Sequence, residues 1–160
     1  MKPSGPLKRH KPLVRKTPLK PGTKRLKSRH RACGPPTAAQ QAHQDLQRAH
    51  GCAMCLLLGY ARSACGVVRV HHRTTGDLHG NKQLGQDDTV GLGDWHHQGT
   101  LMESYPSVEL MRDHFGPSLK EHKKAFLDLI AERLGERSTA ALQRWQDAQL
   151  EASGGDDRAF

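Results

Sequence analysis

The chain has 160 residues, a formal net charge of +9 and a hydrophobic fraction of 35%. This length suits one domain of ordinary size with a modest core. No apolar run approaches the ~20 residues of a membrane helix, and no apolar secretory segment follows the basic N-terminus. We therefore expect no membrane association and a cytoplasmic location, where the 4 cysteines are more typical of a metal site than of disulfides.

The positive charge is concentrated at the N-terminus. Residues 1–31 contain 12 of the 25 Lys and Arg residues and no acidic residue, and five prolines interrupt this segment. We expect residues 1–34 to form a disordered arm that binds nucleic-acid phosphates through its cations. A solubilising tail, contact with anionic membranes and a nuclear address remain alternatives. The cations expected to bind nucleic acid are Lys8, Arg9, Lys11, Arg15, Lys16, Lys20, Lys24, Arg25, Lys27, Arg29 and Arg31.

The rest of the chain predicts a small α+β domain over residues 35–150 and a flexible tail over 151–160. Two short strands cannot bury a core alone, so we expect the helices to pack against them. Capping residues and apolar periodicity indicate where the helices begin. The predicted elements are a helix over 37–48, strands over 67–70 and 89–92, and helices that begin near Asp94, Ser107, Ser118 and Ser138.

Cysteine and histidine residues follow one another in a pattern that indicates metal binding. Cys52 and Cys55 have the C-x2-C spacing of a zinc knuckle, and no βαβ unit of the kind that carries redox C-x-x-C motifs precedes them. Two histidine doublets lie downstream, at 71–72 and at 96–97, each just after an apolar segment. A single histidine is usually structural, but two doublets after a C-x2-C motif favour a site.

These motifs together resemble the HNH (ββα-metal) endonucleases. The resemblance is carried by CAMC at 52–55, VVRVHH at 67–72 and LGDWHH at 92–97. With FGPSL at 115–119 and the basic arm, the chain is most similar to the phage recombination-enhancement nucleases, which cut DNA marked by RecA filaments. The resemblance covers roughly residues 35–145. It implies a small ββα-metal unit packed with helices, in the cytoplasm of a bacterial or phage-infected cell. It also implies two partners, DNA in the form of single strands or joint molecules and a RecA filament.

The resemblance also implies roles for individual residues. It makes His72 the general base, and His71 and His97 the ligands of a catalytic divalent ion, either Mg²⁺ or a transition metal. The asparagine that gives the motif its middle letter falls on Asp88, which could orient the base by accepting its ring N–H. Asn81 is a reserve candidate for this role.

A structural zinc ion is expected in addition to the catalytic ion. The resemblance implies a second C-x2-H pair before the last catalytic histidine, but its cysteine position is Gly93, which offers no ligand. Cys65 is the best replacement, Cys33 is a poorer one, and loss of the zinc site is the other outcome. The predicted zinc ligands are Cys52, Cys55, Cys65 and His96.

Two functions of other classes remain open. A non-catalytic zinc-knuckle module that binds DNA would use the histidines only as ligands. A basic assembly protein would bind RNA or ribosomes through its arm.

Overall fold

The computed structural model describes residues 34–77 and 82–154. Most of the predicted arm (residues 1–33) and the last six residues of the predicted tail lie outside the described residues. The strands are β1 (Val68–His72) and β2 (Thr89–Gly93). The helices are α1 (Ala38–His50), α2 (Ala53–Leu57), the 3-10 helix η1 (Thr75–Asp77), α3 (Asp94–Gln98), α4 (Val108–Phe115), α5 (Lys123–Leu134) and α6 (Thr139–Gly154).

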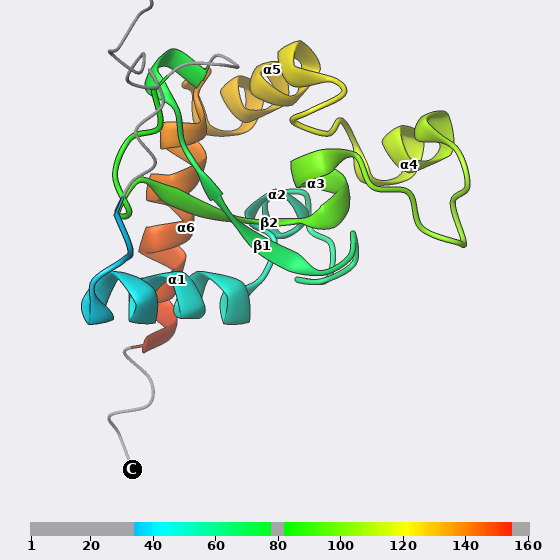
Figure 1. Ribbon diagram of the computed structural model, residues 1–160. Helices are drawn as coiled ribbons and strands as arrows, with labels where there is room; N and C mark the ends of the chain where they lie inside the picture. The colour runs from blue at the N-terminus through cyan, green and yellow to red at the C-terminus, as the bar shows by residue number, and fades with distance from the viewer. Residues whose placement is uncertain (1–33, 78–81, 155–160) are drawn as a thin grey trace, which may run out of the picture.

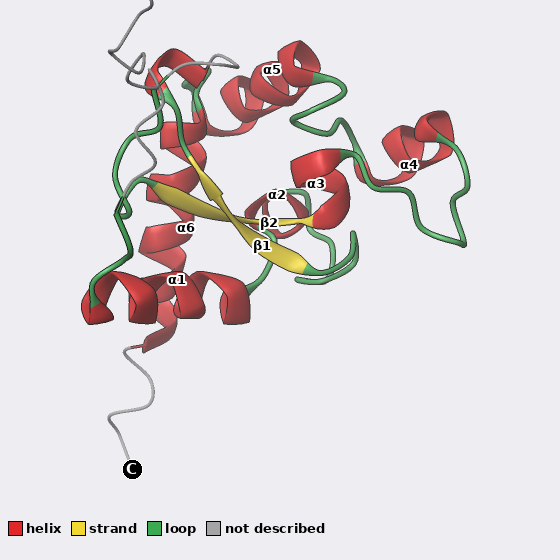
Figure 2. Cartoon of the chain, viewed as in Figure 1, coloured by secondary structure: helices red, strands yellow, loops and turns green. Residues whose placement is uncertain are grey.

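The two strands form a twisted antiparallel hairpin that occupies the centre of the molecule (Figures 1 and 2). In its register Val68 pairs with Gly93 and His72 pairs with Thr89. Both α1 and α6 contact β2, and α3 follows β2 directly. The mixed content confirms the predicted α+β class.

Glycine and glutamine allow the hairpin to lie close against these helices. A Cβ atom at Gly91 would stand 2.9 Å from the carbonyl oxygen of Gln47 at the end of α1. The buried side chain of Gln146 in α6 accepts from the Gly91 N–H at 2.8 Å and donates to the Gly51 carbonyl at 3.0 Å. Because buried backbone groups need partners, Gln146 fastens β2 to the turn before α2.

The core is built by large side chains from the helices and from β2. Trp95 of α3 is fully buried, and its indole N–H donates to the Gly116 carbonyl at 2.9 Å. Phe126 and Ile130 give α5 the apolar face that the sequence predicted. The other large apolar residues that are fully buried are Met54, Leu92, Met111 and Leu142.

Side-chain capping bonds mark the start of α1, α4 and α6. Thr37 and Gln40 form a capping box before α1, with bonds of 3.3 and 2.9 Å between each side chain and the other's backbone N–H. The fifth helix departs from its prediction: Ser118 accepts from the Glu121 N–H, but this closes only a turn, and α5 begins at Lys123. Helix α6 runs to Gly154, four residues into the predicted tail.

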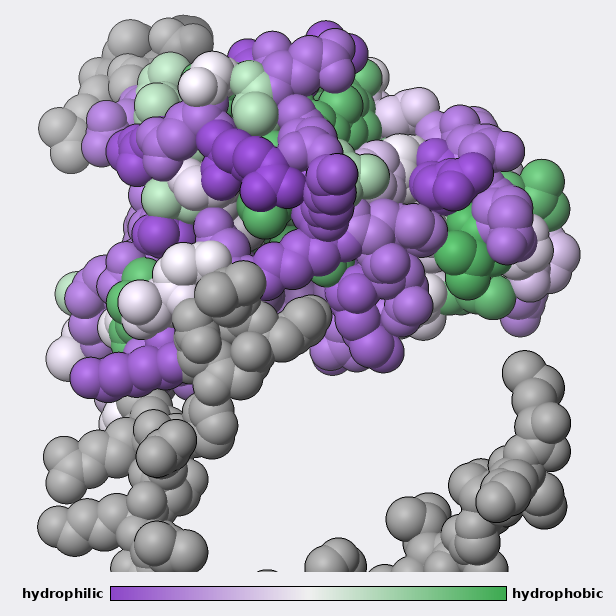
Figure 3. Space-filling model, turned by 90° about the horizontal axis from the view of Figure 1, so that it is seen from above, coloured by the Kyte–Doolittle hydropathy of each residue, from purple (hydrophilic) through white to green (hydrophobic). Residues whose placement is uncertain are grey.

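The surface seen from above, over α5, is mostly hydrophilic (Figure 3). Among the described helices, none combines the length and the apolar character needed to cross a membrane.

Candidate functional site

Three cysteines and one histidine meet in the core next to β2. Cys52 and Cys55 lie at the start of and within α2, Cys65 precedes β1, and His96 lies in α3. All four are 0% exposed, and their ligand atoms lie within 4.8 Å of one another. The Nδ1 atom of His96 is 3.2 to 3.5 Å from the three sulfur atoms. Tetrahedral zinc bonds imply sulfur–nitrogen separations of about 3.5 Å, so the set has the size of a zinc site.

The backbone fixes which nitrogen of His96 faces the sulfur atoms. Its Nε2 lies 2.9 Å from the carbonyl oxygen of Phe115. Because a carbonyl can only accept, the proton belongs on Nε2, which leaves Nδ1 for the cysteines. A second partner of this kind is typical of histidines that bind metals.

One thiol of the cluster, that of Cys52, is held in the anionic form that binds a cation. Burial lowers the pKa of His96, but hydrogen bonds with Cys52 and Cys65 outweigh this and raise it to about 10. Burial raises the pKa of Cys52, yet hydrogen bonds from the neighbouring thiols and His96 hold it well below its usual range. The pKa of Cys55 is raised, first because of its hydrogen bond with Cys52. The fold thus stabilises a buried thiolate, which is the form that binds zinc.

The geometry at Gly93 explains why the expected cysteine is absent there. A Cβ atom at this residue would stand only 2.2 Å from the Cys65 sulfur. The thiol of Cys65 therefore fills the space into which a side chain at residue 93 would project. The four predicted ligands are brought together, and their donor set fits a metal ion such as zinc. Cys33, the poorer candidate, lies outside the described residues.

One histidine from each doublet meets at a second place. The rings of His71 in β1 and His97 in α3 have centroids 5.0 Å apart. They line a pocket of about 340 Å³ together with Gln98, Leu119 and Lys120. The Leu119 N–H donates to the His96 carbonyl at 2.8 Å, which holds the residues around Lys120 against α3.

This histidine pair is held in the neutral form. Burial, followed by the neighbouring His97, lowers the pKa of His71 to about 4. Burial also lowers the pKa of His97, although Asp94 opposes the shift. The Nδ1 atom of His97 is buried and has no hydrogen-bond partner. Two neutral imidazoles, one of which has an unpaired nitrogen, are suitable ligands for a divalent ion, so the residues present fit the predicted catalytic metal.

An ion pair beside this pocket was not predicted. Arg69 donates to Asp94 at 2.6 Å, and both charges act on the pKa of His97. Arg69 precedes His71 by two residues on one strand, and Asp94 precedes His97 by three on one helix. These spacings place each charge on the face of its histidine and could have revealed the pair.

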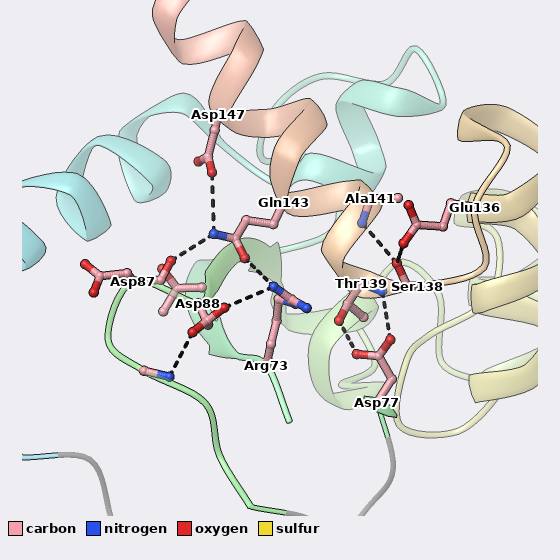
Figure 4. Close-up of polar contacts among 12 residues, drawn as sticks. Arg73, Asp77, Asp87, Asp88, Glu136, Ser138, Thr139, Ala141, Gln143 and Asp147 are labelled. Carbon is pink, nitrogen blue, oxygen red and sulfur yellow. Dashed lines mark hydrogen bonds and ion pairs between the residues drawn. The ribbon is translucent and has the colours of Figure 1, made fainter. Parts of the chain in front are cut away.

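The predicted base, His72, and its predicted partner, Asp88, have different neighbours from those that the resemblance implied. Successive strand residues point to opposite faces, so His72 lies on the face of its pairing partner Thr89, opposite to His71. Its Nδ1 is buried without a hydrogen-bond partner. The Asp88 carboxylate pairs with Arg73 at 3.2 Å and accepts from the Gly85 N–H at 3.0 Å (Figure 4). The Asp88 carboxylate is thus engaged with Arg73 and Gly85 and not with His72, so the roles of both stay predictions. Asn81 lies outside the described residues.

Comparisons with protein families, with curated proteins and with solved structures found no match to this chain.

Proposed function

We propose that the chain is a metal-dependent DNA endonuclease of the HNH type. The observation that carries the proposal is the meeting of His71 and His97 at a pocket, one helical residue away from a Cys3His cluster. Two neutral imidazoles beside a lysine suit the binding of a cation and a phosphate group together. On this proposal the two histidines of the second doublet have different roles, because His96 binds the structural zinc and His97 binds the catalytic ion.

His71 and His97 would hold the divalent ion, which supplies a Lewis acid for the leaving oxygen of a phosphodiester. Lys120, which lines the pocket, would attract the phosphate through its ammonium group. His72 is the proposed base, and it lies close enough to His71 to lower the pKa of that ring. Its proposed task is to take a proton from the attacking water.

The zinc cluster would act as a support for this site. Its ligands come from α2, from the residues before β1 and from α3, so one ion would fasten all three segments. His96 and His97 are adjacent, so fixing His96 also restricts His97. We therefore assign the zinc a structural role, since its ligands are wholly buried.

DNA is the proposed substrate, and the basic arm is proposed to supply affinity for it. The 12 cations of residues 1–31 would neutralise phosphates without regard to base sequence. Single strands or joint molecules, formed in recombination or repair and marked by RecA filaments, remain the proposed setting. Deleting residues 1–31 should weaken DNA binding and flatten its salt dependence, while the hydrolytic site stays intact.

Nicking of supercoiled plasmid tests the proposal. The full chain should convert the plasmid to the open circle when Mg²⁺, Mn²⁺ or Ni²⁺ is added. His71→Ala and His97→Ala should each remove this activity, while His114→Ala, at an exposed position on α4, should keep it. His72→Ala should abolish cleavage but leave DNA binding unchanged. Absence of nicking with every ion would refute the nuclease.

The orientation of His72 and the pairing of Asp88 with Arg73 favour one alternative, a non-catalytic zinc module that binds DNA. On that reading the protein binds one zinc ion and DNA but never cuts. The same plasmid assay, run beside a DNA-binding measurement, separates the two.

A further inference from the structure

A second pocket on the same protein is lined by three basic side chains. It has a volume of about 380 Å³ and is formed by Gly76 and Asp77 of η1, Lys123, Lys124 and Leu127 of α5, and Arg137 after α5. It is called the Lys123 pocket here. We propose that the Lys123 pocket binds a phosphate group of the same nucleic-acid strand whose neighbouring phosphodiester enters the His71–His97 pocket. This inference rests on the proposed function.

The charges in the Lys123 pocket are available to a ligand. Lys123 and Lys124 form no ion pair with any acidic residue in the described part of the chain. The acidic residue in the lining is already engaged: Asp77 accepts from the backbone N–H of Thr139 at 3.0 Å and from its hydroxyl (Figure 4). The carboxylate of Asp77 therefore caps α6 and is not ion-paired with either lysine, and the three cations of the lining outnumber this one acidic residue.

Arg137 adds directional donors to these charges. Its Nε donates to Asp128 at 2.5 Å, which orients the side chain along α5. A guanidinium carries five donors, so the terminal nitrogens remain for a planar pair of phosphate oxygens. The pocket thus combines two ammonium groups with one guanidinium group that can donate two parallel hydrogen bonds, and this combination suits a phosphate better than a single carboxylate.

The backbone of α5 contributes in the same direction. Lys123 and Lys124 are its first two residues, and the capping residue His122 makes no side-chain capping bond. The first turn of a helix carries partial positive charge and unpaired N–H groups. This effect adds to the lysine charges in attracting an anion.

The Lys123 pocket lies next to the His71–His97 pocket. Lys120 lines one pocket, and Lys123, three residues later, lines the other. Asp77, in the lining of the second, is close enough to His71 for its charge to act on that ring. A strand that crosses both would contact Lys120 at the first pocket and the cations of the Lys123 pocket at the second.

The test compares two charge-matched pairs of substitutions in the full chain. Lys123→Gln with Lys124→Gln removes two cations from the pocket. Arg48→Gln with Arg112→Gln removes two exposed cations elsewhere, since Arg48 lies on α1 and Arg112 lies on α4. Thermal unfolding checks that both pairs fold. Binding of a labelled oligonucleotide is measured between about 50 and 200 mM salt, where phosphate contacts make affinity strongly salt-dependent. The His71→Ala substitution is present in all chains of this comparison to prevent cleavage.

The lysine pair should weaken binding at least about tenfold and reduce the salt slope by about one unit per lysine. The arginine pair should change the slope much less. Equal effects of the two pairs would mean that only bulk charge matters and would overturn the inference, as would no effect of the lysine pair. If the chain never nicks plasmid, the proposed function fails, but the comparison of the pairs still decides the pocket. If it nicks and the lysine pair leaves KM unchanged, the pocket fails and the nuclease stands.

Discussion

A single methyl group at residue 93 should expel a zinc ligand. The backbone of Gly93 has φ −71° and ψ 161°, a conformation open to any residue, so Gly93→Ala brings no backbone strain. Its new Cβ would instead stand 2.2 Å from the Cys65 sulfur, whereas ordinary contacts begin at 3.4 Å. The sulfur would have to retreat by about 1.2 Å, well beyond the tolerance of about 0.2 Å for a zinc bond.

The loss of zinc affinity in Gly93→Ala follows from the contribution of one ligand to the free energy of zinc binding. Structural zinc sites bind with about 10–16 kcal/mol in total, so the loss of one of four ligands should remove about 2.5–4 kcal/mol. This corresponds to a fall in zinc affinity of about 10²- to 10³-fold. Competition with a chromophoric chelator measures the affinity, and elemental analysis gives the zinc content per chain. Gly34→Ala is the matched control, because nothing lies within 4 Å of that position.

A compensating exchange tests the steric argument separately from general damage. In Cys65→Ala with Gly93→Cys, the new thiol begins about one carbon–sulfur bond from the vacated sulfur position, so zinc binding should return. Cys65→Ala alone should stay defective. Full zinc affinity in Gly93→Ala, or no recovery in the exchange variant, would refute the reasoning.

Three further predictions concern stability. Gln146→Ala should lower the free energy of unfolding by about 2–6 kcal/mol, because it leaves the Gly91 N–H and the Gly51 carbonyl buried without partners. Urea unfolding measures this change. The control Gln149→Ala, at an exposed position on α6, should lower the free energy of unfolding by less than about 0.5 kcal/mol. Removal of zinc by a chelator should lower Tm, and zinc but not Mg²⁺ should restore it, because only a thiolate-binding ion can fasten the segments that carry the ligands. Without added catalytic ion, the free energy of unfolding should fall as the pH drops from 6.5 toward about 4, because the pKa of His71 is lowered to about 4 and the unfolded chain binds the proton first. The slope should be at most about 1.4 kcal/mol per pH unit. A slope that is unchanged in His71→Gln would contradict this assignment.

The sequence determined the elements that depend on neighbours along the chain. The capping box of Thr37 and Gln40 and the cap at Ser107 involve residues three positions apart, so their pattern predicts where α1 and α4 begin. The same reasoning failed at Ser118, because a capping bond to Glu121 is also compatible with an isolated turn. The choice between turn and helix was made by packing around α3.

The metal ligands were predictable as residue types, since cysteine and histidine at these spacings have few other uses. The sequence also gave good reason to choose Cys65 once Gly93 offered no ligand. The sequence could not show why a cysteine at residue 65 goes together with a glycine at residue 93. That reason is a distance of 2.2 Å between atoms 28 residues apart in the chain.

Only the tertiary structure decided how the histidines are shared. Strand alternation separates His71 from His72, and α3 turns His96 toward the sulfur atoms while His97 meets His71. Likewise, Lys123, Lys124 and Arg137 are brought to one pocket with Asp77 because α5 packs against α6, whose first residue, Thr139, bonds Asp77. Local sequence fixes which chemical groups are present and which turns and helices begin where. Their meeting depends on the path of the backbone through space, which is set by the burial of side chains far apart along the chain.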